Sequence, residues 1–241
     1  MAIFDPGPAD NWVRWRIPDG VRQVPIRMTL RTFIGLFLFV CLSVVLTHFY
    51  LDARIARFLY QQLDARNPLL GPMDRLTHIA SYLFLMVCAI ALAGWAVYLY
   101  LRHTGIDNSH RRFFLLISVA LPVAFLLKSF LQDVFGAPSP REWLRHPDEW
   151  GFHWFAGAGY MNAFPSGHMT VLTPLIIALW RFYPRCRKIS LALWLALASG
   201  LVVTNSHFVS DVIAGAYIGL LVDFNVRMGL SLLPGSDASR H

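Results

Sequence analysis

The chain alternates between long apolar segments and shorter polar ones. A helix needs about 20 mostly apolar residues to cross the hydrocarbon core of a bilayer. None of the apolar segments shows the polar face that a surface helix of a soluble bundle would carry. We therefore predict an all-α fold, a bundle of six transmembrane helices. The predicted spans are Leu30–Leu51, Leu76–Leu101, Phe113–Phe135, Gly167–Tyr183, Ile189–Ser206 and Asp211–Leu232.

Composition agrees with a membrane protein. The chain is 56% hydrophobic and only 15% charged, with a mean hydropathy of +0.49, whereas an average soluble domain is about 25% charged. The first 29 residues contain prolines and arginines but no apolar stretch, so we predict no cleavable signal peptide. The expected organisation is an N-terminal cytoplasmic arm (1–29), one membrane domain (30–232) and a cytoplasmic tail (233–241).

The basic residues indicate the orientation of the spans. The net charge is +7, but the Lys and Arg side chains flank the apolar segments and form no nucleic-acid-binding patch, so we expect no nucleic-acid partner. Fourteen of them lie on the side of both termini and six on the other side. The positive-inside rule then places both termini in the cytoplasm. We predict an integral membrane protein, of a bacterial inner membrane, whose first, third and fifth connections face outward.

The third connection, 136–166, is long and rich in tryptophan, phenylalanine, tyrosine and glycine. Loops of this length in compact proteins are often lids or binding elements. Tryptophan and tyrosine also favour the membrane interface. The sequence is compatible with a lid over a site and with a simple interfacial anchor.

A short motif, Pro165-Ser166-Gly167-His168, lies where this loop meets the fourth span. A helix that begins at Gly167 leaves backbone N–H groups unpaired, and we expect those of Ser166, Gly167 and His168 to be free to bind an anion. The Ser166 hydroxyl adds a donor, and His168 can exchange a proton. The alternative is a serine helix cap followed by an incidental histidine.

A second motif begins the sixth span on the same predicted membrane face. His207 and Asp211 are separated by four positions, so they share a helix face. A carboxylate there can orient the imidazole and leave its other nitrogen as a nucleophile. Lys128, near the outer end of the third span, needs a partner or a bound anion, unless it snorkels to the interface.

These motifs resemble those of the type 2 phosphatidic acid phosphatase superfamily, whose pattern is Lys-x6-Arg-Pro, Pro-Ser-Gly-His and Ser-Arg-x5-His-x3-Asp. The second motif is complete here, and the third keeps His207 and Asp211. The arginine positions differ. Leu201 occupies the one in the third motif, and Phe135-Gly136 falls at the arginine-proline of the first. The resemblance covers about residues 76–225 and implies six membrane helices arranged in the helix bundle that this family shares with the soluble haloperoxidases.

The resemblance implies a lipid phosphatase that forms a phosphohistidine. His207 would attack phosphorus, Asp211 would orient it, and His168 would protonate the leaving oxygen. Lys128, Ser166 and Gly167 would bind the phosphate, and Arg141 is the candidate to replace the missing arginines. No metal ion or other cofactor is expected, since no metal-binding pattern is visible. Two alternatives stay open, a phosphodiester head-group transferase and a non-catalytic lipid-binding relative, and the sequence gives no oligomeric state.

Overall fold

The computed structural model describes residues 30–64, 82–106, 109–156 and 159–231, and within these ranges it contains helices and no strand. The predicted arm (1–29) and tail lie outside the described residues. One isolated β-bridge joins Ala137 to Asn162. The long helices are α1 (Leu30–Thr47), α4 (Leu83–His103), α5 (Ser109–Phe135), α7 (Gly167–Phe182), α8 (Arg187–Val203) and α9 (Val209–Ser231); shorter ones are α2 (Ala53–Leu59) and α6 (Pro140–Arg145).

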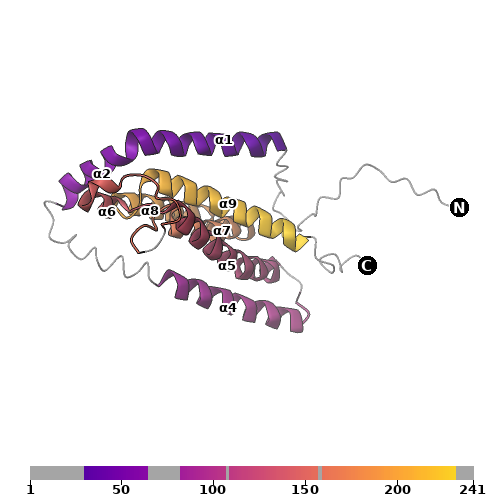
Figure 1. The fold of residues 1–241 in the computed structure, drawn as a ribbon. Helices are drawn as coiled ribbons and strands as arrows, with labels where there is room; N and C mark the ends of the chain where they lie inside the picture. The colour runs from indigo at the N-terminus through magenta and orange to yellow at the C-terminus, as the bar shows by residue number, and fades with distance from the viewer. Residues whose placement is uncertain (1–29, 65–81, 107–108, 157–158, 232–241) are drawn as a thin grey trace.

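Helices α5, α7 and α9 contact one another and form the centre of the bundle. The outer helices add to this centre: α4 packs on α5, α1 on α9, and α8 on α7. Figure 1 shows α1 and α4 on opposite sides of the bundle, with α5 and α9 between them. Helices α2 and α6 lie at one end, which we call the site end; α1 begins and α9 ends at the opposite end.

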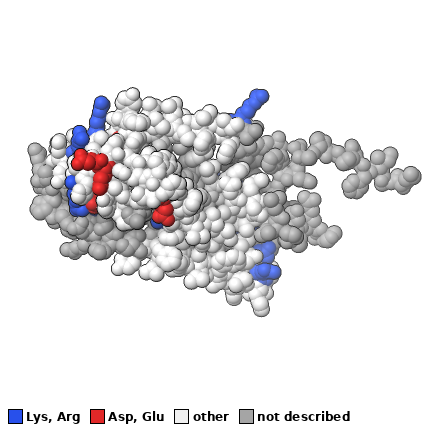
Figure 2. All heavy atoms as spheres, viewed as in Figure 1, with Lys and Arg blue, Asp and Glu red and all other residues white. Residues whose placement is uncertain are grey.

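The predicted all-α membrane fold is confirmed in part. Within the described ranges, five helical segments are long and apolar enough to cross a membrane. The fourth predicted span, α7, has 16 residues, fewer than the roughly 20 that a spanning helix needs, so the count of six spans stays a prediction. Figure 2 shows charged side chains at the two ends of the visible face, with an uncharged band between them. Large apolar side chains such as Phe39, Leu92 and Phe130 are exposed, as lipid contact requires.

The first membrane helix is longer than predicted. It continues from Arg31 to Gln62, past the expected end at Leu51. A π-helical turn, His48–Asp52, widens the helix near its middle, and such turns often occur at functional sites. Asp52 does not end the span, because its carboxylate is buried against α9 and hydrogen-bonded there.

Two glycines of α9 allow it to approach α7 closely. A Cβ atom added to Gly215 would lie 2.6 Å from the Ser166 carbonyl oxygen, and one added to Gly219 would lie 2.7 Å from that of Thr170. Small residues spaced four apart bring membrane helices into backbone contact in this way. The sequence Gly215-x3-Gly219 therefore sets the distance between the two predicted catalytic motifs.

Candidate active site

The two motifs meet where α7 and α9 begin. Ser166 precedes α7, and its N–H donates a hydrogen bond to the backbone oxygen of Asp211 at 3.1 Å. Our expectation that this N–H is free was therefore wrong, because the first turns of α7 and α9 bind each other directly. The Ser166 carbonyl in turn accepts from the N–H of Thr170 at 3.0 Å and from its Oγ1 at 2.9 Å.

The other donors expected at the start of α7 are the Ser166 hydroxyl and the N–H groups of Gly167 and His168. The Ser166 side chain is fully buried, and its Oγ has no hydrogen-bond partner within the described part of the chain. Gly167 and His168 occupy the first turn of α7, where helix geometry leaves N–H groups without an intrahelical acceptor. A buried hydroxyl with no partner loses about 1–3 kcal/mol of solvation, which a bound phosphate oxygen would restore.

His207 and Asp211 form the predicted pair at the start of α9. The His207 Nδ1 atom lies 3.5 Å from Asp211 Oδ2. The same carboxylate oxygen accepts a 2.8 Å hydrogen bond from the Phe208 N–H, so Asp211 also caps its own helix. The ring centroids of His168 and His207 are 6.4 Å apart. The structure thus brings together all three residues predicted to be catalytic.

Lys128 is connected to the start of α7 through Gln132, a residue that the sequence analysis missed. Its Nζ donates to Gln132 Oε1 at 3.0 Å, and Gln132 Nε2 donates to the Pro165 carbonyl at 3.0 Å. A Cβ atom on Gly167 would lie 3.2 Å from Lys128 Cδ, so the lysine stem runs against the start of α7. The available signal was the spacing of Gln132, four residues after Lys128 and on the same helix face.

Arg141 lies at the site end but has a backbone partner. Its Nε and one terminal nitrogen both donate to the carbonyl oxygen of Thr204, at 3.0 and 2.6 Å. Thr204 ends α8 and begins the short connection to His207. The guanidinium therefore anchors this connection, and its contact with a phosphate stays a prediction.

The backbone explains one departure from the family motif. Gly136, at the expected proline position, has φ of +52°, its N–H donates to the Gln132 carbonyl, and its carbonyl accepts from His153. Proline is fixed near φ −65° and has no N–H, and a Cβ atom at Gly136 would collide with the His153 carbonyl. The chain therefore turns sharply after Phe135, with a backbone conformation that the sequence Arg-Pro could not adopt.

Part of the 136–166 loop covers the site end. Trp150 and Phe152 stack on the ring of His48, with centroid distances of 4.8 and 5.4 Å. Trp154 and Phe155 are exposed instead, as expected of an interfacial segment. In the same loop, Tyr160 donates a hydrogen bond to Glu149, which raises the pKa of the Tyr160 phenol.

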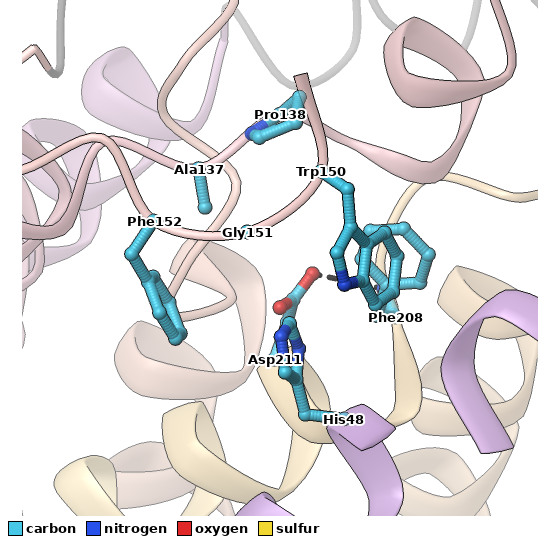
Figure 3. A pocket seen from close by; sticks show the side chains of 8 residues that line it. All are labelled: His48, Ala137, Pro138, Trp150, Gly151, Phe152, Phe208 and Asp211. Atoms are coloured by element: carbon cyan, nitrogen blue, oxygen red, sulfur yellow. Dashed lines mark hydrogen bonds between the residues drawn. The ribbon is translucent and has the colours of Figure 1, made fainter. Parts of the chain in front are cut away.

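Figure 3 shows a small pocket beside Trp150 and Phe152. It is lined by His48, Ala137, Pro138, Trp150, Gly151, Phe152, Phe208 and Asp211.

The sequence analysis also missed His48 and Asp52 in the first membrane helix. His48 Nδ1 lies 3.8 Å from Asp52 Oδ2. The signal was present, since His48-x3-Asp52 has the same spacing as His207-x3-Asp211 and lies within an apolar segment, where titratable residues usually mark a site. Among the described residues, no three His, Cys, Asp or Glu side chains are grouped so as to hold a metal ion.

Comparison with known proteins finds one matching family model, two similar proteins and one similar solved structure. Residues 113–228 match the family model of the PAP2 superfamily. Two lipid A 1-phosphatases, from Rhizobium etli and Rhizobium johnstonii, are each 33% identical over 99 residues. These alignments cover 39% of this chain and 40% and 38% of the relatives, so the chain matches less than half of their length. The crystal structure of a transmembrane PAP2-type phosphatidylglycerolphosphate phosphatase from Bacillus subtilis is 22% identical, with a TM-score of 0.45, over 84% of this chain and 98% of that one.

Proposed function

From the premise that residues 113–228 belong to the PAP2 superfamily, we propose that this protein is an integral-membrane lipid phosphatase. It hydrolyses a lipid phosphate or diphosphate through a phosphohistidine intermediate. The observation that carries the proposal is the junction of α7 and α9, where His168, His207 and Asp211 lie together beside the unpaired Ser166 hydroxyl.

The geometry supports a division of labour between the two histidines. Asp211 faces Nδ1 of His207, which leaves Nε2 to attack phosphorus. The phosphorus–oxygen bond to the lipid breaks as His168 gives its proton to the leaving oxygen. His168 then takes a proton from water, the water oxygen attacks the phosphohistidine, and the phosphorus–nitrogen bond breaks. Inorganic phosphate leaves, and both histidines return to their starting forms.

The remaining predicted residues stabilise the phosphoryl group. The Ser166 hydroxyl and the Gly167 N–H are suited to donate hydrogen bonds, and Lys128 beside Gly167 supplies positive charge. Arg141 would add a further charge-assisted contact only if its guanidinium turned from the Thr204 carbonyl to the phosphate. With donors of this kind at the site, we expect turnover without a metal ion and therefore full activity in the presence of a chelator.

The relatives suggest which lipids to test first. Because both are lipid A 1-phosphatases, a lipid A phosphate is the first candidate, followed by phosphatidate and an isoprenyl diphosphate. Purified protein in detergent micelles is incubated with each lipid, and free phosphate is measured. We expect phosphate release from at least one of them and none with His207→Ala. Absence of phosphate release from every lipid would contradict the proposal.

A second function is favoured by the residues at the arginine positions. Leu201 and Phe135-Gly136 leave the site with less fixed positive charge than the family pattern, and a phosphodiester carries only about one negative charge, against about 1.5 to 2 for a monoester near neutral pH. The same histidines would then pass a head group to an acceptor alcohol. Transfer of a labelled head group without phosphate release, in the same lipid panel, would identify this transferase.

The proposed localisation is an inner membrane of a bacterium, with the site on the extracytoplasmic face. It rests on the distribution of basic residues. A reporter that is active only outside the cytoplasm, inserted after residue 157, should give a signal, and the same reporter fused after residue 231 should not. The reverse pattern would contradict the orientation.

A further inference from the structure

We propose that Asp52 and His48, in the first membrane helix, are positioning residues that hold the start of α9 and thereby set Asp211 against His207. This inference rests on the proposed function, because it assigns them a role in that site. Neither residue belongs to the PAP2-matched segment, residues 113–228.

The first argument is the set of bonds that Asp52 makes. Its side chain is 1% exposed. One carboxylate oxygen accepts a 3.2 Å hydrogen bond from the N–H of Ser210, and the other accepts from the Ser210 hydroxyl. Asp52 thus binds the residue directly before Asp211, and it does so from a different helix. A charged acceptor makes such hydrogen bonds roughly twice as strong as neutral ones.

The second argument is that the first turn of α9 depends on carboxylates for its N–H groups. Asp211 accepts from the N–H of Phe208, and Asp52 accepts from that of Ser210. A helix N-terminus attracts negative charge because its N–H groups lack intrahelical acceptors. If Asp52 loses its charge, Asp211 becomes the only carboxylate of the two that faces this turn, and its orientation toward His207 changes.

The third argument is the placement of His48. It lies four residues before Asp52 in the π-helical turn, with Nδ1 3.8 Å from the carboxylate. Its ring is stacked against Trp150 at an interplanar angle of 15°. His48 also lines the pocket to which Asp211 contributes (Figure 3). The imidazole therefore lies between the Asp52 carboxylate and the covering loop, close to both.

A double-mutant cycle tests the coupling that this arrangement requires. Asp52→Asn keeps the shape of the side chain and removes its charge. We expect kcat to fall by about tenfold to 100-fold, since small displacements of reacting groups have effects of that size, with KM within about twofold. In an Asp211→Asn background, the same substitution should change kcat by less than about twofold, because the residue through which Asp52 acts has already lost its function.

The matched control is Asp223→Asn, the same substitution at a carboxylate that lies on α9 itself and, like Asp52, is 1% exposed. It should show no such coupling to Asp211. Equal effects of Asp52→Asn in both backgrounds, or a change in kcat of less than twofold in the wild-type background, would overturn the inference. If Asp52→Asn does not fold, Ser210→Ala replaces it, since it removes one of the two bonds.

A measurement without substrate separates this inference from the proposed function. In protein labelled with ¹⁵N-histidine, the His207 signals are identified by their loss in His207→Gln. We expect Asp52→Asn to shift the His207 ring nitrogens and Asp223→Asn to leave them unchanged. Unchanged signals in Asp52→Asn would overturn the inference even if the enzyme is an active phosphatase. A shift together with no phosphate release from any lipid would contradict the proposed function and support the positioning role.

Discussion

Helix α9 carries buried carboxylates toward both of its ends, and their partners differ in kind. In its first turn, Asp211 faces an imidazole and a backbone N–H, and Asp52 binds Ser210. Toward its other end, Asp223 is held by two arginines. Its oxygens accept from Arg181 at 3.0 and 3.3 Å and from Arg227 at 2.9 Å. The imidazole beside Asp211 is able to exchange protons, whereas Asp223 lies between ions that stay charged.

This difference separates residues that are able to take part in catalysis from residues that join the helices. An arginine stays protonated at any working pH, so the Asp223 cluster can join α7 to α9 but cannot shuttle protons. An imidazole can be neutral or charged, and it can therefore attack phosphorus or donate a proton. The comparison predicts that substitutions at the site end change the rate of folded protein, whereas those around Asp223 change how much protein folds.

The largest expected effect is at His207. His207→Ala should lower phosphate release by at least about 10³-fold, because it removes the atom that we propose attacks phosphorus. Elution of the variant at the wild-type position in detergent gel filtration would show that it is folded. Activity near that of the wild type would exclude His207 as the nucleophile.

A smaller loss is expected when the orienting carboxylate changes. Asp211→Asn should reduce kcat by roughly 10²–10⁴-fold, since the amide does not stabilise the required form of the imidazole. The comparison between the two ends of α9 makes Asp223→Asn the control, and its kcat should stay within about threefold once the rate is divided by the amount of folded protein. Equal losses of kcat in Asp211→Asn and Asp223→Asn would show that the two ends of α9 do not differ in this way.

The next effect concerns the contact between α7 and α9. Gly215→Ala adds a methyl group 2.6 Å from the Ser166 carbonyl, so it should push the two motifs apart. Overpacking of this kind destabilises by roughly 1–3 kcal/mol, and we expect lower kcat as well as a lower unfolding temperature. Gly229→Ala, in the same helix with no atom within 4 Å of its added Cβ, should leave both unchanged. If Gly215→Ala leaves kcat and the unfolding temperature unchanged, the close approach of α7 and α9 is not required.

Around Asp223 we expect a loss of stability. Asp223→Asn leaves two arginines, with side chains 19% and 21% exposed, facing each other without their carboxylate. Breaking a buried ion pair costs about 3–5 kcal/mol, and the unfolding temperature in detergent should fall accordingly. An unchanged unfolding temperature would show that this cluster is not the joint between α7 and α9.

The smallest effect is expected at Arg141. Because its guanidinium binds the Thr204 carbonyl, Arg141→Ala should lower kcat by less than about tenfold through a looser connection to His207. A loss of roughly 10²–10³-fold would instead match removal of a donor to the developing charge and would place the guanidinium on the phosphate. Leu201→Arg is a complementary test of the missing charge. It should raise the rate of monoester hydrolysis only if the site lacks positive charge.

Much of the fold and the site could be predicted from local sequence. Apolar segments identify membrane helices because unpaired backbone groups are costly in lipid. Titratable residues at the ends of such segments stand out for the same reason, which is why Lys128, His168, His207 and Asp211 were found. Helix periodicity places His207 and Asp211 on one face before any tertiary contact is known.

Tertiary structure decided what depends on contacts between distant segments. No local pattern shows that Asp52 reaches Ser210, that Ser166 donates to Asp211, or that Arg141 binds Thr204. Each bond joins helices or loops that are remote in the chain, so each depends on how α1, α7, α8 and α9 pack. The sequence by itself determined which side chains are able to do chemistry; packing decided which of them share a site, because burial and partner distance are properties of the assembled bundle.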